Sequence, residues 1–326
     1  MKIRALSADL IRKLAPYGET IPLMARTLAS VSRGEAELPL RWALSVPGGG
    51  GALVLMPGYL GSENSAGIKL VSLSPNAATQ RRPSHLGLVV LYDADGLVPV
   101  ALLCGSTVTA LRTAAATACA TSVLADPAAR VLAILGSGEQ ADAHLDALRH
   151  ARNFAQIRIW SRTRANAEAL AVKHSNREPL IQVHDTIESA INGADVICTL
   201  TAAPTPILHG RLVAPGAHVN LVGSSGRTTA EADDELVERS RFFVDFRKSA
   251  MAQAGELLNA IERGHVSSDH LLAELGEVID GRKSGRTARN DVTVFKSLGI
   301  AAEDIALAAH VYRKAEAAGL GQVFEL

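Results

Sequence analysis

The stretch Val131 to Ala141, VLAILGSGEQA, decides the fold of this chain. Its first five residues are apolar and predict a buried strand, which runs directly into the pattern G-x-G-x-x-A at the start of a helical segment. Gly136 allows a sharp turn, Gly138 allows a diphosphate to approach the backbone, and Ala141 allows the helix to pack on the strand. The helix N-terminus adds N–H groups that favour phosphate. We therefore predict a dinucleotide-binding unit, with these cofactor-binding residues: Gly136, Ser137, Gly138, Glu139 and Gln140.

The next predicted strand, residues 157–160, indicates which nicotinamide cofactor is bound. It is followed by Ser161, Arg162, Thr163 and Arg164, where an NAD-selective site usually carries an acidic residue. Two guanidinium groups and two hydroxyls can hold a 2′-phosphate, whereas a carboxylate would repel it. The segment predicts NADPH as the cofactor, with NADH possible. The alternative interpretation is that these arginines lie at a solvated helix start.

Strands and helices continue to alternate toward the C-terminus. Strands are predicted at residues 181–184, 195–201, 217–222, 242–245 and 292–296. In an open parallel sheet the ligand lies beyond the carboxyl ends of the strands. Thr201 and the pair Ser224-Ser225 are therefore expected near the ligand, although they could equally be ordinary loop residues. Val222 and Leu298, at their strand ends, complete the predicted cofactor site. The predicted fold class is α/β, with a central Rossmann-type doubly wound sheet.

Two basic residues stand in apolar surroundings in the first part of the chain. Strands are predicted at residues 40–46, 52–56, 67–73, 86–92 and 97–103, and the alternation of side chains directs Lys69 inward. The alternative is an edge lysine whose ammonium reaches water. Arg112 is the only charged residue between positions 98 and 125, within TALRTAAATACA. It needs an anionic partner, which could be a distant acid of the protein or an anionic ligand.

Composition limits the classes of partner. The 326 residues include 33 basic and 33 acidic side chains and are 4% aromatic, so no nucleic-acid surface is predicted. The three cysteines lie far apart in apolar sequence and the ten histidines show no paired spacing, which predicts reduced thiols and no metal site. No signal peptide or membrane span is indicated. We expect a soluble, cytoplasmic protein that binds neither nucleic acid nor membrane.

Motifs spread over nearly the whole chain together resemble one known family. They are MPGYLG, GIKLVS, RRPSHLGLVVLY, TALRTAAATA, ILGSGEQADAH, IWSRT, GADVICTLT, PGAHVNLVGSS, LGEVIDG and TVFKSLGIAAEDIA. The family they resemble is the ornithine cyclodeaminase/mu-crystallin family. The resemblance implies a homodimer whose discontinuous α+β domain, residues 1–125 and 300–326, binds substrate and dimerises through its sheet. It also implies a Rossmann dinucleotide-binding domain over residues 126–299.

The same resemblance implies roles for individual residues. Arg41 and Arg112 are implied to bind the carboxylate of an amino or imino acid in a cleft, and Lys69 to lie beside the reacting carbon and nitrogen. His85, in the matching sequence PSH, is implied to contact the cofactor. The implied catalytic residues are Lys69, Arg112 and Ser225, and the same three residues with Arg41 are implied to bind the substrate.

Ser225 departs from part of the family. Cyclodeaminases and the related alanine dehydrogenases carry an aspartate here that acts on the substrate amine, and without it activation of a primary amine or a water is not expected. In having serine at this position, the chain resembles the ketimine-reducing members of the family. The leading hypothesis is NADPH-dependent reduction of a cyclic imino acid, Δ1-pyrroline-2-carboxylate or Δ1-piperideine-2-carboxylate, to L-proline or L-pipecolate. The alternatives are a lyase (ornithine cyclodeaminase or cis-3-hydroxy-L-proline dehydratase), an amino-acid dehydrogenase and a non-catalytic binder of small ligands.

Overall fold

The structure is a computed structural model that describes residues 1–48, 51–74 and 85–325. The chain divides into two compact units: unit 1 comprises Met1–Arg112 and Ile300–Leu326, and unit 2 comprises Thr113–Gly299. The sequence predicts the first division at residue 125, where the Ala-rich helix ends. The first boundary between the two compact units lies after Arg112, within helix α3 (Gly105–Leu124).

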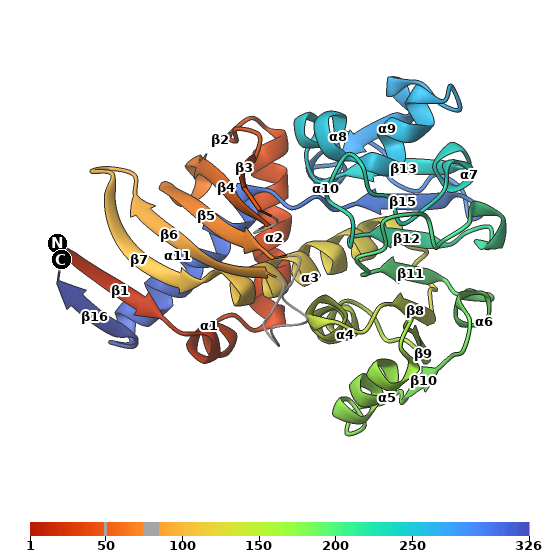
Figure 1. Cartoon of the computed structure of the whole chain (residues 1–326), viewed down its shortest axis with the longest axis horizontal. Coiled ribbons are helices and arrows are strands. Elements are labelled where there is room, and N and C mark those ends of the chain that lie inside the picture. The colour runs from red at the N-terminus through yellow and green to blue at the C-terminus, as the bar shows by residue number, and fades with distance from the viewer. Residues whose placement is uncertain (49–50, 75–84, 326) are drawn as a thin grey trace. The chain divides into compact units, whose positions relative to one another are not determined.

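Unit 1 is built on a mainly antiparallel sheet. The strand order is β16-β1-β7-β6-β5-β4-β2, β3 also pairs with β4, and the pair β1 and β7 is parallel. The strands are β1 (Lys2–Leu6), β2 (Ala36–Glu37), β3 (Trp42–Val46), β4 (Gly51–Leu60), β5 (Ser65–Leu73), β6 (His85–Asp93), β7 (Val98–Cys104) and β16 (Gln322–Glu325). The sheet therefore joins β1 and β16, which lie at opposite ends of the sequence (Figure 1).

One face of this sheet is covered by helix α11 (Ala301–Ala317), drawn in blue in Figure 1. An added Cβ at Gly58 or at Gly67 would lie 3.0 Å from a side chain of α11, so the helix rests almost on the strand backbone. Met56 and Lys69 are paired in register and both point to this covered face. The other helices of the unit are α1 (Ala8–Leu14), α2 (Tyr17–Ser32) and the single turn η1 (Gly61–Glu63).

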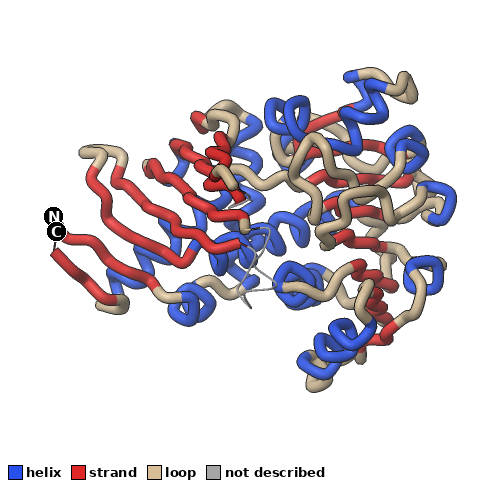
Figure 2. The backbone as a smooth tube through the Cα atoms, viewed as in Figure 1, coloured by secondary structure: helices blue, strands red, loops and turns tan. Residues whose placement is uncertain are grey.

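Unit 2 contains an eight-stranded parallel sheet in the order β10-β9-β8-β11-β12-β15-β13-β14. Its strands, red in Figure 2, are β8 (Val131–Leu135), β9 (Gln156–Trp160), β10 (Ile181–Val183), β11 (Val196–Thr199), β12 (His218–Leu221), β13 (Ser240–Val244), β14 (Leu271–Glu274) and β15 (Val292–Lys296). The chain builds outward from β8 to β10 and then crosses back to β11, so the direction of winding reverses between β8 and β11. This is the Rossmann-type topology predicted from the sequence, and ligands bind at such a reversal point.

Helices connect these strands, and they are shown in blue in Figure 2. They are α4 (Glu139–Ala151), α5 (Arg164–Lys173), α6 (Ile187–Ile191), α7 (Asp234–Glu238), α8 (Arg247–Gln253), α9 (Gly255–Glu262), α10 (Leu275–Ile279) and the turns η2 (Gly210–Leu212) and η3 (Ser268–His270). The sequence patterns predict the first helices of the unit but miss α7 to α10 and β14.

A buried polar network fixes α3 to the sheet of unit 2. The Asn220 side chain donates to Thr121 Oγ1 at 3.0 Å, and its carbonyl oxygen lies 3.1 Å from His218 Nε2. His218 Nδ1 lies 2.9 Å from Thr293 Oγ1. Burial lowers the pKa of His218 to about 3, so the imidazole is neutral at physiological pH. Within the described ranges, no helix is long and apolar enough to cross a membrane.

Candidate active site

The dinucleotide turn has the backbone that its glycines predict. Gly136 has a φ of +134°, a conformation that side-chain-bearing residues rarely adopt, and an added Cβ would lie 2.5 Å from the carbonyl oxygen of Leu200. The turn therefore passes directly against the end of β11. At Gly138, by contrast, an added Cβ would meet no atom within 4 Å. The open space at Gly138 is where the motif predicts the approach of a diphosphate.

Helix α4 starts directly after this turn. Its N-cap is Gly138, which has no side chain to accept from the first N–H groups, and its first residues are Glu139 and Gln140. Ser137 Oγ lies 2.8 Å from Ser161 Oγ, so the turn after β8 is joined to the residue after β9. The uncapped N-terminus of α4 and this hydroxyl pair form one polar edge at the carboxyl ends of two neighbouring strands.

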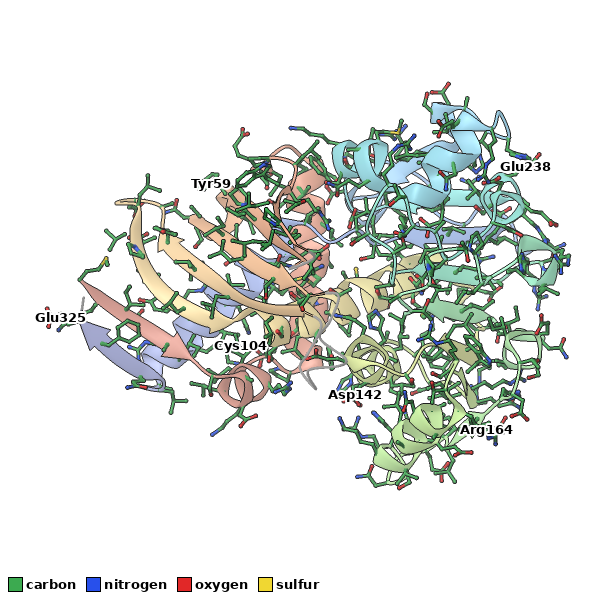
Figure 3. The ribbon with its side chains drawn as sticks, in the orientation of Figure 1. Tyr59, Cys104, Asp142, Arg164, Glu238 and Glu325 are labelled. Carbon is green, nitrogen blue, oxygen red and sulfur yellow. The ribbon has the colours of Figure 1, made fainter. Side chains whose placement is uncertain are left out.

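The two arginines after β9 have different surroundings. Arg164, labelled in Figure 3, starts α5 and pairs with Glu168 at 2.8 Å and with Asp185. Arg162 is exposed and makes no ion pair with any residue in the described ranges. Thr163 is the N-cap of α5. The guanidinium of Arg164 is therefore already neutralised by two carboxylates, whereas that of Arg162 is not.

The remaining predicted cofactor residues lie at three other strand ends of unit 2. Thr201 follows β11, Val222 follows β12 and is buried, and Leu298 follows β15. The backbone N–H of Leu298 donates to Asp245 Oδ2 at 2.6 Å, which fixes the chain where it leaves β15. His85 begins β6 of unit 1, but its side chain lies outside the described part of the structure.

Unit 1 contains a buried cluster of charged side chains, formed by Lys69 on β5, Arg112 on α3, and Glu303 and Asp304 in the first turn of α11. Asp304 Oδ1 accepts from Lys69 Nζ at 3.0 Å and from Arg112 Nε at 3.1 Å, and Oδ2 lies 2.8 Å from Lys69 Nζ. Arg112 Nη1 donates to Glu303 Oε2 at 2.6 Å. Lys69 and Arg112 are 3% and 4% exposed. Asp304 therefore bridges both cations inside the unit.

This environment changes the acidity of Lys69. Burial, followed by the positive charge of Arg112, lowers the pKa of the Lys69 ammonium from 10.5 to about 8. The carboxylate of Asp304 opposes this change because it attracts the charged form. Arg41, which precedes β3, also lowers the pKa of Lys69, so its charge acts on the same ammonium. The charges of Arg112 and Arg41 thus both act on the Lys69 ammonium.

Sequence analysis predicts the inward direction of Lys69 correctly but misses Glu303 and Asp304. For Arg112 it leaves two kinds of partner open, a distant acid and an anionic ligand. The structure shows two distant acids, which lie 191 and 192 positions away in the chain. The sequence does contain a sign of these two acids' role: Glu303 and Asp304 interrupt an Ala-rich helix, and the first turn of that helix is buried. Acidic residues in a first helical turn normally indicate only a favourable interaction with the helix dipole, which hides their role here.

Ser225 lies in unit 2, in the exposed loop after β12. Its neighbour Ser224 is buried and donates through Oγ to the carbonyl of Thr229 at 2.8 Å. Position 225 thus carries a small hydroxyl, and not a carboxylate, in the loop after β12. The predicted substrate residues are therefore divided between the two units.

The dinucleotide turn and the strand order define a Rossmann-type dinucleotide-binding protein. A model of the ornithine cyclodeaminase/mu-crystallin family matches residues 6–319, and the chain belongs to this family. The ketimine reductase mu-crystallin of Rattus norvegicus is 38% identical over 311 residues, which are 94% of this chain and 96% of that protein.

Two further relatives match nearly the whole chain. A Δ1-pyrroline-2-carboxylate reductase of Bacillus cereus is 32% identical over 323 residues, 98% of this chain and 99% of that one. A solved structure of the Thermococcus litoralis Δ1-pyrroline-2-carboxylate reductase, in complex with NADH and L-proline, matches with a TM-score of 0.94 at 31% identity. The match covers 98% of this chain and 99% of that chain. The family resemblance inferred from the motifs is confirmed.

The two glycines of the turn predict opposite outcomes when each is changed to alanine. Gly136→Ala should lower the free energy of unfolding by about 2–4 kcal/mol, because the new Cβ meets Leu200 and the backbone is strained. Gly138→Ala should change stability by less than about 1 kcal/mol but weaken NADPH binding, because its Cβ enters the space predicted for the diphosphate. Denaturant unfolding and NADPH fluorescence titration measure both. Wild-type NADPH affinity in Gly138→Ala would contradict the assignment.

Proposed function

We propose that this protein reduces cyclic imino acids, Δ1-pyrroline-2-carboxylate or Δ1-piperideine-2-carboxylate, to L-proline or L-pipecolate with NAD(P)H. The observation that carries the proposal is the buried charge cluster of unit 1. With Arg41 it holds three basic and two acidic side chains, so its formal charge of +1 suits a substrate with a single carboxylate. The named activities of the relatives in Rattus, Bacillus and Thermococcus support this choice.

The residues of unit 1 divide the chemistry between them. Arg41 and Arg112 bind the substrate carboxylate, and Glu303 and Asp304 hold the Arg112 guanidinium in place. Lys69 hydrogen-bonds the ring nitrogen and delivers the proton that the amine product needs. When bound, the reduced nicotinamide supplies the hydride that adds to the imine carbon. One hydride to carbon and one proton to nitrogen thus convert the C=N bond to CH–NH. Ser225 contributes a hydroxyl to substrate binding.

The proposal is tested by adding Δ1-pyrroline-2-carboxylate to the protein and NADPH at neutral pH without ammonia. Oxidation of NADPH with formation of proline is expected, and Arg112→Met should lower kcat/KM by about tenfold or more through loss of charge-assisted hydrogen bonds. Ammonia release from ornithine, with no oxidation of NADPH by the imino acid, would instead establish a lyase and contradict the proposal.

For the cofactor, we propose a preference for NADPH that depends on Arg162. Arg164 is paired with Glu168 and Asp185, so Arg162 is the better candidate for the 2′-phosphate. Gly136, Ser137, Gly138, Glu139 and Gln140 would hold the diphosphate, and Ser161 and Thr163 would lie beside the ribose phosphate. His85, Thr201, Val222 and Leu298 remain proposed contacts of the cofactor.

Changing each arginine to alanine separates their roles. Arg162→Ala should raise the KM for NADPH about tenfold and leave that for NADH unchanged, because only NADPH carries the 2′-phosphate. Arg164→Ala, the matched control, should have a smaller effect on the NADPH to NADH ratio. Steady-state kinetics with both cofactors give the comparison. An equal loss with NADH in Arg162→Ala would contradict the assignment.

We further propose a cytoplasmic homodimer that forms through the sheet of unit 1. The face opposite α11 is apolar: Trp42 is 58% exposed and Leu88 is 50% exposed, and Leu44 and Leu53 lie beside each other on β3 and β4. So large an apolar face is typical of an interface. Sedimentation should give twice the 34.2 kDa mass of one chain, and Leu88→Glu should give monomers. A monomeric wild-type protein would contradict the proposal.

A further inference from the structure

Glu231 is a fully buried acid that the proposed chemistry does not use. It lies between two buried alanines in unit 2, and its carboxylate accepts four hydrogen bonds. Oε1 accepts from the backbone N–H of Thr201 at 2.8 Å and from its hydroxyl at 2.7 Å. Oε2 accepts from the backbone N–H of Gly223 at 2.6 Å and from the hydroxyl of Thr199 at 2.7 Å. One side chain therefore joins the carboxyl ends of β11 and β12.

The two strand ends leave no spare room around this carboxylate. An added Cβ at Gly223 would lie 2.1 Å from the carbonyl oxygen of Thr201 and 2.6 Å from Glu231 Oε1. The turn after β12 thus packs directly on the turn after β11, and this close approach requires glycine. Since Thr201 and the segment after Gly223 are the proposed ligand contacts, the carboxylate fixes the backbone from which those contacts extend.

A second layer of buried charge supports the first. Glu256 Oε1 accepts from the backbone N–H of Glu231 at 3.0 Å and from Lys296 Nζ at 3.0 Å. Lys296 Nζ also donates to the carbonyl oxygen of Ser224 at 2.6 Å. Glu256 and Lys296 are 1% and 0% exposed. The arrangement extends the contact to β15 and holds the peptide that precedes Ser225.

Stability alone does not explain so many buried charges. Taking carboxylates and an ammonium out of water is unfavourable, and a well-packed apolar replacement is often at least as stable. What such groups supply is a fixed geometry of the backbone donors around them, since each oxygen accepts only in certain directions. The place where this geometry is imposed is the carboxyl edge of three neighbouring parallel strands.

We propose that Glu231 is a positioning residue that holds Thr201 and the Gly223–Ser225 turn in the arrangement that binds the nicotinamide cofactor and the substrate. The inference rests on the proposed function for the identity of both ligands. The carboxylate is required, because a carboxamide would turn an N–H donor toward either Gly223 N–H or Thr201 N–H. Two donors would then face each other, and one turn would move away from its strand neighbour.

The test compares Glu231→Gln with Glu235→Gln, a matched change at an exposed position on α7. Three quantities are measured: the Kd for NADPH by fluorescence, kcat and KM for the imino acid, and the Tm of the protein without ligands. We expect Glu231→Gln to raise the Kd for NADPH about tenfold and to lower kcat, while Glu235→Gln resembles the wild type. A lower Tm with Kd and kcat within twofold of wild type would show a purely structural role and overturn the proposal.

Thr199→Val keeps the proposal testable if Glu231→Gln does not fold. Valine removes the buried hydroxyl that donates to Glu231 Oε2, and Thr199 is not a proposed ligand contact. A several-fold rise in the Kd for NADPH is therefore expected, and an unchanged Kd overturns the inference. Failure of the proposed function is distinguishable, because the wild type would then bind NADPH but not oxidise it with an imino acid. The NADPH titrations still compare the variants in that case.

Discussion

The carboxylate of Asp304 inside unit 1 is the interaction on which the proposed substrate site depends. It contacts Lys69 and Arg112 at the same time, and it does so from the first turn of a helix that follows Gly299, the last residue of unit 2. Breaking a buried ion pair by removing one partner typically costs roughly 3–5 kcal/mol, because a charge is left uncompensated. One carboxylate therefore connects α11 to β5 and α3 and opposes the lowering of the Lys69 pKa. Gly58 and Gly67 allow this by letting the helix approach the strands closely.

The two units position their proposed ligand-binding groups by different means. Unit 1 uses charged side chains that are distant in sequence. Lys69 and Arg112 balance Glu303 and Asp304, and the charge of Arg41 leaves an excess of +1 that suits a carboxylate. Unit 2 uses backbone geometry: Gly136 places the dinucleotide turn against Leu200, and Gly223 brings the turn after β12 against Thr201. Glu231 links that backbone to a buried acid. In our account, one unit supplies charge and proton to the substrate, and the other holds the cofactor by its backbone.

Local patterns in the sequence predict the parts of this arrangement that depend on local rules. The direction of Lys69 follows from the alternation of side chains along a strand, and the Gly136 turn follows from a run of apolar residues that ends in glycine. The partners of Arg112 do not follow, because no local pattern states which distant acid will meet it. Glu231 is hidden for a related reason: in TTAEADDE it is one of several acids, and only the fold shows that it is buried while Glu235 is exposed. Strands β1 and β16 are not predicted from the sequence, and their pairing joins residues that lie almost the whole chain apart.

We propose that Asp304 keeps Lys69 protonated, so that the ammonium can give its proton to the imine nitrogen. The most direct measurement is the pH dependence of kcat/KM for imino-acid reduction in the wild type and in Asp304→Asn. The pKa of Lys69 is about 8, so wild-type kcat/KM should fall as the pH rises through that value and the ammonium loses its proton. In Asp304→Asn the attraction that raises this pKa is lost, and the fall should move to lower pH. The imine itself titrates identically with both enzymes. The difference between the two enzymes in the pH at which kcat/KM falls therefore reports on Lys69. A fall at the same pH in both would contradict the account.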